Sequence, residues 1–161
     1  MNNLFHKKCV YLAQVTNFSQ KGQTDKLKTN SQNIKIVGCV TYGNGLGQQM
    51  GFPTANIAPS HPIDEGVEDG VWAGEVSIGG KHYGSVVNIG YSPSVVTKGS
   101  RRIEAHIIDF CGNIYGSPIE LILLHHLRPE RKFPSREALV EQIALDLEEA
   151  KRLLANSDAT K

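Results

Sequence analysis

A short stretch between residues 43 and 51 carries four glycines and is the first candidate for binding an anion. Gly43, Gly45 and Gly47 alternate with other residues, and glycine tolerates positive φ and close backbone approach, so successive N–H groups can turn inward around a phosphate. The stretch has neither the Gly-Lys-Ser/Thr ending of a P-loop nor a G-x-G-x-x-G window, so neither motif applies. A surface turn without a ligand is the alternative, because Gly and Asn mark turns in either case.

Two oxygen-bearing side chains follow these glycines. Thr54 and Asn56 come directly after the rigid Phe52-Pro53 pair, and side chains two residues apart on an extended chain point to the same side. Hydroxyl and amide oxygens are hard ligands that suit Mg²⁺, which completes its octahedron with water and nucleotide phosphate. The stretch therefore predicts a phosphate cradle with a magnesium site beside it.

Glu104 is a carboxylate on a predicted strand. Residues 102–110 alternate as a strand, in which Glu104 shares one face with Arg102 and His106. The opposite face is rich in Ile and Ala and is predicted to pack in the core. The Glu104 carboxylate therefore lies on the other face, where it can stand in a pocket or at the rim of one. The alternative is an ordinary solvated carboxylate paired with Arg101 or Arg102.

Short motifs occur in a specific order from residue 34 to residue 154. They are Gly38-x-Val40, the glycine stretch with Gly51-Phe52-Pro53-Thr54-Ala55-Asn56, Val87-Asn88-Ile89-Gly90, Glu104-Ala105-His106-Ile107-Ile108-Asp109-Phe110, Tyr115-Gly116, and Leu127-Arg128-Pro129-Glu130-Arg131-Lys132-Phe133. Each is weak alone, but the ordered set resembles the riboflavin kinase family. The resemblance implies an enzyme that transfers a phosphoryl group from ATP to the 5′-hydroxyl of riboflavin, giving FMN and ADP, with Mg²⁺ or another divalent ion.

The resemblance also implies roles for individual residues. Glu104 matches the catalytic glutamate, and Thr54 and Asn56 match the magnesium site. The implied ATP contacts are Gly43, Gly45, Gly47, Thr54, Asn56, Ile107, Asp109 and Tyr115. The implied flavin contacts are Arg128, Arg131 and Phe133. Without the resemblance, Ile107 would be predicted as a core residue and Tyr115 as an aromatic residue of a strand. Phe133 would be predicted as a hydrophobic staple at the start of a helix, and the arginines as solvated charges.

The glycine stretch departs from the family in its charge. Family members commonly carry Arg or Lys at or near the position of Gln48, whereas this stretch has no positive charge between Gly43 and Gly51. A charge-assisted contact to phosphate is typically worth about 1.5–3 kcal/mol, so slower activity or weaker ATP binding is expected. Ser94 follows Pro93 where the family often has Pro-Thr. The alternatives are a non-catalytic flavin- or nucleotide-binding barrel and a plain barrel used for protein contacts.

Composition favours one domain that acts on small molecules. The chain has 161 residues with 40% hydrophobic content, which is enough for one core and short for two. A net charge of +1 gives no broad field for nucleic acid or an anionic membrane. Cys9, Cys39 and Cys111 form no C-x-x-C pair, and no His pair has i, i+4 spacing, which argues against disulfide scaffolds and zinc sites. We expect a cytoplasmic monomer without a membrane-spanning segment or a signal peptide.

The candidate site residues must be positioned by strands in which apolar and polar residues alternate, joined by tight turns. Strands are predicted at residues 34–40, 70–78 and 81–89, with Gly79-Gly80 as a two-residue hairpin turn between the last two. A second hairpin is predicted between residues 102–110 and 114–127, around Gly112-Asn113. Together these strands predict a mainly β fold, a small antiparallel Greek-key-like barrel of about six strands.

A C-terminal amphipathic helix is predicted to pack on the barrel. Its apolar stripe consists of Leu139, Ile143, Leu147, Ala150 and Leu154, with Ser135 as N-cap. Asp146 is assigned to the solvent-facing side with the other charged residues. Residues 1–33 are predicted to be a flexible leader, residues 34–154 the barrel with its helix, and residues 155–161 a frayed tail. Bacterial riboflavin kinases often follow an adenylyltransferase domain, and residues 1–33 are too short to form one.

Overall fold

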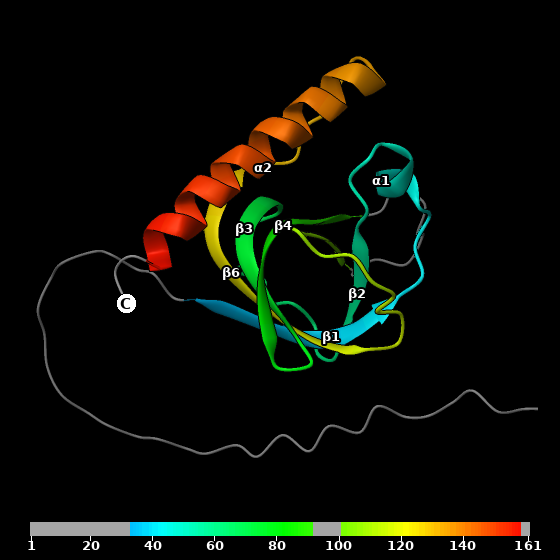
Figure 1. Ribbon diagram of the computed structural model, residues 1–161. Helices are drawn as coiled ribbons and strands as arrows, with labels where there is room; N and C mark the ends of the chain where they lie inside the picture. The colour runs from blue at the N-terminus through cyan, green and yellow to red at the C-terminus, as the bar shows by residue number, and fades with distance from the viewer. Residues whose placement is uncertain (1–32, 92–100, 159–161) are drawn as a thin grey trace, which may run out of the picture. The chain divides into compact units, whose positions relative to one another are not determined.

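The computed structural model describes residues 33–91 and 101–158, and within them six strands close into a barrel (Figure 1). The strands are β1 (Ile34–Thr41), β2 (Ala55–Pro59), β3 (Gly70–Ile78), β4 (Lys81–Tyr91), β5 (Arg101–Ile107) and β6 (Pro118–Arg128). Their order around the barrel is β1-β2-β5-β4-β3-β6, and all neighbours are antiparallel. Because β6 returns to lie beside β3 after the consecutive strands β3, β4 and β5, the topology is a Greek key. The predicted fold class is confirmed.

Alternate residues of each strand fill the barrel. On β5, Ile103 and Ala105 are completely buried, whereas Glu104 and His106 are half-buried on the outer face. The same alternation on β4 buries Val87 and Ile89 and leaves Asn88 between them half-buried. The outer face of the barrel therefore carries the polar side chains of interest, as the alternation predicted.

The hairpin between β3 and β4 forms at the predicted glycines. Gly79 has φ 57° and Gly80 has φ 80°, and Ile78 pairs with Lys81 across the turn. Positive φ at both central residues is the geometry of a type I′ turn, which matches the twist of the flanking strands.

The second predicted hairpin is wrong. β5 pairs with β2 and β4, whereas β6 pairs with β1 and β3, so the two strands are not neighbours. Both edges of β5 are already occupied, and the chain leaves it through Asp109, whose φ of 54° turns the backbone. At the other end of the connection, the N–H of Gly116 donates to the carbonyl of Val40 on β1 at 2.9 Å. A local turn signal such as Gly112-Asn113 cannot reveal which strands become neighbours.

Helix α2 (Arg136–Asp158) lies against β3, β4 and β6 on the outside of the barrel (Figure 1). Ser135 caps it as predicted, because the N–H of Ala138 donates to its Oγ at 3.2 Å. The pKa of Glu137 in the first turn is lowered, first by its own backbone N–H and then by the Ser135 hydroxyl. The helix continues to Asp158, so residues 155–158 belong to it, while residues 159–161 lie outside the described part.

Asp146 is a correction to the predicted polar face of this helix. It is only 5% exposed, and the Arg128 Nη2 lies 2.7 Å from its Oδ2. Asp146 comes three residues after Ile143 and four before Ala150, so the helical spacing places it on the buried stripe. Assigning every charged residue to solvent overlooked this spacing.

Other sequence predictions lie outside the described residues. They include the leader up to residue 32 and Ser94 with its preceding proline. No helix in the described ranges is long and apolar enough to cross a membrane.

Candidate functional site

The glycine stretch folds as a tight loop around one helical turn, α1 (Leu46–Gln49). Gly45 and Gly51 flank it with φ of 68° and 85°, a region that favours glycine. The N–H of Phe52 donates to the carbonyl of Gly47 at 2.9 Å and closes the loop on itself. The predicted glycine-rich loop is therefore a compact turn held by its own backbone.

Thr54 and Asn56 lie directly against this loop. A Cβ added at Gly43 would stand 1.9 Å from Nδ2 of Asn56. A Cβ added at Gly47 would stand 2.4 Å from the carbonyl oxygen of Phe52 and 3.0 Å from Oγ1 of Thr54. The absence of side chains at these two glycines is thus what allows the loop to approach the two oxygen-bearing residues.

Glu104 stands in a row of polar side chains on the outer face of the barrel. It is opposite Asn56 on β2 and opposite Asn88 on β4. All three residues are half-buried, and Oε1 of Glu104 lies 3.4 Å from Nε of Arg102. Directly opposite residues of antiparallel strands bring their side chains together on one face. The row Asn56–Glu104–Asn88 therefore connects the glycine loop to the middle of the sheet.

The segment after β6 reaches the other end of this row. Nδ2 of Asn88 donates to Oε1 of Glu130 at 3.2 Å. A Cβ added at Gly90 would stand 2.3 Å from the Glu130 carboxylate, so this glycine also makes room for the segment. Glu104 consequently lies between the glycine loop on one side and the segment that begins at Pro129 on the other.

The predicted flavin residues gather around one ring. The guanidinium carbons of Arg128 and Arg131 lie 5.6 Å and 4.8 Å from the centroid of Phe133. Nε of Arg128 donates to both carboxylate oxygens of Asp146, which turns much of this guanidinium toward the helix. A hollow of about 360 Å³ beside Arg131 and Phe133 opens at the start of α2.

A larger hollow of about 550 Å³ opens near the glycine loop. Among the predicted ATP contacts, Thr54, Ile107 and Tyr115 line it, together with Gln48 from α1. The other predicted contacts, Gly43, Gly45, Gly47, Asn56 and Asp109, are not among its lining residues. Residues 110–115 form much of its wall. The wrong hairpin prediction concealed this wall, because it treated these residues as the turn and the adjoining strand ends of a hairpin.

Tyr42, which the sequence analysis did not single out, contacts Tyr115 at the edge of this hollow. Its ring stacks on that of Tyr115 at a centroid distance of 4.2 Å and an interplanar angle of 22°. Tyr42 is 81% exposed although it is aromatic, and it directly precedes the glycine loop. An exposed aromatic pair offers a flat surface at the cavity wall. Its position beside Gly43 was the signal available in the sequence.

Arg136 brings a positive charge to the otherwise uncharged loop. Its Nη2 donates to the carbonyl of Gln49 at 2.6 Å, which joins the first residue of α2 to the end of α1. The glycine loop and the segment containing Phe133 are thereby linked at the side of the barrel where α2 begins.

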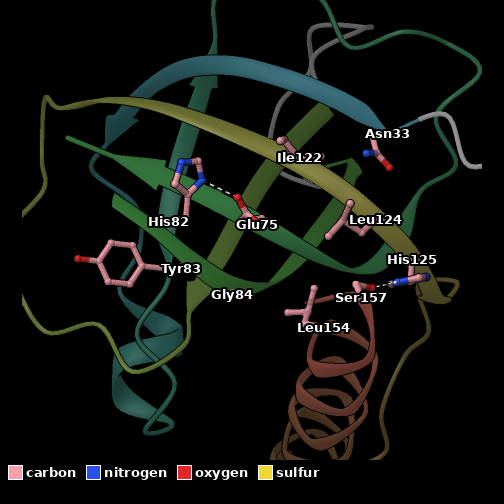
Figure 2. A pocket seen from close by; sticks show the side chains of 10 residues that line it. All are labelled: Asn33, Glu75, His82, Tyr83, Gly84, Ile122, Leu124, His125, Leu154 and Ser157. Atoms are coloured by element: carbon pink, nitrogen blue, oxygen red, sulfur yellow. Dashed lines mark hydrogen bonds and ion pairs between the residues drawn. The ribbon is translucent and has the colours of Figure 1, made fainter. Parts of the chain in front are cut away.

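Cavity size alone does not locate this site. A hollow of about 650 Å³ lies between the end of α2 and strands β3, β4 and β6 (Figure 2), and it contains none of the predicted site residues. Four of its polar side chains form two pairs, with Glu75 Oε1 2.5 Å from His82 Nδ1 and His125 Nε2 3.4 Å from Ser157 Oγ. Within residues 33–91 and 101–158, no group of three His, Cys, Asp or Glu side chains is arranged to hold a metal ion.

Known proteins are similar to this chain in sequence, and a solved structure is similar to it in fold. The chain is 35% identical over 127 residues to a bifunctional riboflavin kinase/FMN adenylyltransferase of Pseudomonas fluorescens, covering 77% of this chain and 39% of the relative. It is 37% identical over 113 residues to the RNA-binding riboflavin kinase RibR of Bacillus subtilis, covering 70% and 47%. A crystal structure described as a macrolide-efflux protein from Streptococcus pneumoniae matches with a TM-score of 0.67 and 31% identity, covering 74% and 38%. The chain thus spans less than half the length of each.

The family comparison covers nearly the whole barrel and its helix. The family described as "Flavokinase: Riboflavin kinase" matches residues 30–154. This range agrees with the region over which the ordered motifs occur, residues 34–154. The chain therefore belongs to the riboflavin kinase family.

Proposed function

We propose that this chain transfers the terminal phosphoryl group of ATP to the 5′-hydroxyl of riboflavin and forms FMN and ADP. The hydroxyl oxygen forms a new bond to the terminal phosphorus, the bond from that phosphorus to the bridging oxygen breaks, and the hydroxyl proton passes to the carboxylate of Glu104. Phosphoryl transfer depends mainly on positioning and on charge stabilisation, with a base to orient the acceptor. Family membership supports the reaction.

The row Asn56–Glu104–Asn88 is the observation that carries the proposal. Gly43 abuts one end of it through Asn56, and Glu130 contacts the other end through Asn88. A nucleotide held by the glycine loop and a flavin held by the segment after β6 would meet at Glu104. The proposed base thus occupies the boundary between the two proposed substrate sites.

Thr54 and Asn56 are the proposed magnesium ligands. A hydroxyl and an amide oxygen suit this hard cation, and the close approach of Gly47 to Thr54 Oγ1 leaves the hydroxyl at the loop. Mg²⁺ bound there would neutralise charge on the nucleotide phosphates. We assign the phosphates to Gly43, Gly45 and Gly47. Ile107 and Tyr115 would hold the rest of ATP, and Asp109 would shape the wall through its left-handed turn.

Phe133 and Arg131 are the proposed flavin contacts, with Arg128 behind them. A flavin needs a flat apolar surface with polar groups at the rim. The ring of Phe133 beside the 360 Å³ hollow supplies the surface, and Arg131 supplies donors. We further propose that the protein acts on small molecules as a cytoplasmic monomer, without nucleic acid or membrane, in line with its net charge of +1.

The direct test is product formation. The purified chain is incubated with riboflavin, ATP and Mg²⁺, and the flavins and nucleotides are separated by chromatography. We expect FMN and ADP in equal amounts, and neither when EDTA removes the divalent ion. If a folded sample, identified by its cooperative unfolding transition, binds flavin but forms no FMN, the chain is a flavin-binding module and not a kinase.

Gly43→Ala is expected to raise the KM for MgATP. The added methyl would stand 1.9 Å from Nδ2 of Asn56, so the amide must move from its place beside Glu104. Loss of about one hydrogen bond's worth of stabilisation corresponds to a rise in KM for MgATP of roughly tenfold. Gly66→Ala is the matched control, because its methyl would meet only the flexible Asp64 side chain at 3.2 Å. Equal KM values for the two variants would remove Gly43 from the site.

A further inference from the structure

We propose that His106 is a positioning residue that fixes the exit of the glycine loop to the strand carrying Glu104; this inference rests on the proposed function. His106 follows Glu104 by two residues on β5, so both side chains stand on the outer face of the barrel. Nδ1 of His106 lies 2.8 Å from the carbonyl oxygen of Pro53. The contact therefore joins two segments that are 53 residues apart in the chain.

The contact falls where backbone pairing ends. β2 begins at Ala55, which pairs with Ala105, so Pro53 and Thr54 lie immediately before the paired strand. Proline has no N–H to donate and restricts the residue before it, so the sheet alone does little to hold this corner. The imidazole of His106 provides a side-chain bond at that point.

His106 also contacts Phe52, the residue that precedes Pro53 in the chain. Its ring lies 5.8 Å from that of Phe52 at an interplanar angle of 79°, an edge-to-face arrangement. The N–H of Phe52 in turn donates to the carbonyl of Gly47. Two successive residues are thus held by one side chain, and the first of them, Phe52, closes the glycine loop. The Thr54 hydroxyl, which follows directly, takes its position from this arrangement.

The chemistry of the bond defines what a substitute must supply. A carbonyl oxygen only accepts, so Nδ1 of His106 must carry the hydrogen, in the neutral Nδ1–H tautomer or in the imidazolium. The Nδ2 of asparagine occupies nearly the same position as this nitrogen and also donates. Leucine has similar bulk but offers no donor. The two replacements therefore separate the hydrogen bond from the filling of space.

The first measurement is a split between the two Michaelis constants. His106→Leu is expected to raise KM for MgATP roughly tenfold and to change KM for riboflavin less than about twofold, because the bond controls the glycine loop and not the segment around Phe133. His106→Asn should recover most of the loss. His82→Leu is the control, since His82 is an exposed strand histidine beside the other hollow. Equal changes in both constants, or no recovery with Asn, would overturn the assignment.

The second measurement does not require activity. Hydrogen–deuterium exchange of a peptide covering residues 47–54 should be faster in His106→Leu than in the wild type and close to the wild type in His106→Asn. Unfolding curves of each variant identify any global loss of stability. If the wild type makes no FMN, the proposed kinase activity fails but the exchange still decides the role of His106. Unchanged exchange in His106→Leu contradicts that role, whatever the activity.

Discussion

Replacing Glu104 with Gln is expected to lower the turnover of riboflavin by about 100- to 10,000-fold, the usual contribution of a general base. The amide keeps the size of the side chain and its neighbours Asn56 and Asn88 across the strands, but it cannot accept a proton. Substrate affinity should change little, because the lost function belongs to the chemical step. Single-turnover formation of FMN, together with a flavin-binding titration, measures the two effects separately.

Glu120→Gln provides the matched control. Glu120 is also a half-buried strand carboxylate with a basic partner, since its Oε2 lies 2.8 Å from Nζ of Lys35, but it stands on β6 away from the row. Its loss should leave turnover close to the wild-type value. If Glu104→Gln and Glu120→Gln turn over equally fast, Glu104 is an ordinary surface carboxylate paired with Arg102, which is the alternative that its sequence position left open.

The alternation of side chains explains how much of the fold was predictable. Local patterns were sufficient for β1, β3 and β4, for the Gly79-Gly80 turn and for the Ser135 cap, because each depends on residues a few positions apart. The arrangement of β5 and β6 was not predictable in this way. It depends on which strands occupy the two edges of β5: β4, which directly precedes it, occupies one edge, and β2, from further back in the chain, occupies the other. Pairing over such separations has no signal within the segment 108–117.

The same distinction applies to the site. The motif order predicted Gly43, Asn56 and Glu104 as parts of one site. In the structure Gly43 approaches Asn56, and Asn56 lies opposite Glu104 on the neighbouring strand, while their roles stay predictions. The role of His106 was missed, since its contact with Pro53 crosses two segments and an alternating strand shows only that it faces outward. Asp146 was misassigned for a related reason, because a buried carboxylate is acceptable only when its partner arrives from another element.

Removing the carboxylate with Asp146→Ala is expected to lower the free energy of unfolding by about 3–5 kcal/mol, the usual effect of breaking a buried ion pair. Arg128 is 17% exposed at its side chain and would keep its charge with no carboxylate beside it. The change would also remove the acceptor of the 2.7 Å bond from Nε2 of Gln142. Urea unfolding followed by circular dichroism measures this loss. Glu149→Ala, which breaks the exposed pair with Arg152, is the control and should leave the midpoint nearly unchanged.

A double variant separates the structural role of Arg128 from its proposed role in flavin binding. Arg128→Met with Asp146→Leu replaces both charges by apolar groups, and such replacements are often neutral or stabilising because no desolvated charge is left. We therefore expect stability to recover relative to Asp146→Ala. If Arg128 also contacts the flavin, the recovered protein will bind riboflavin more weakly than the wild type. Full recovery of both stability and riboflavin affinity would instead confine Arg128 to holding α2 and Phe133 in place.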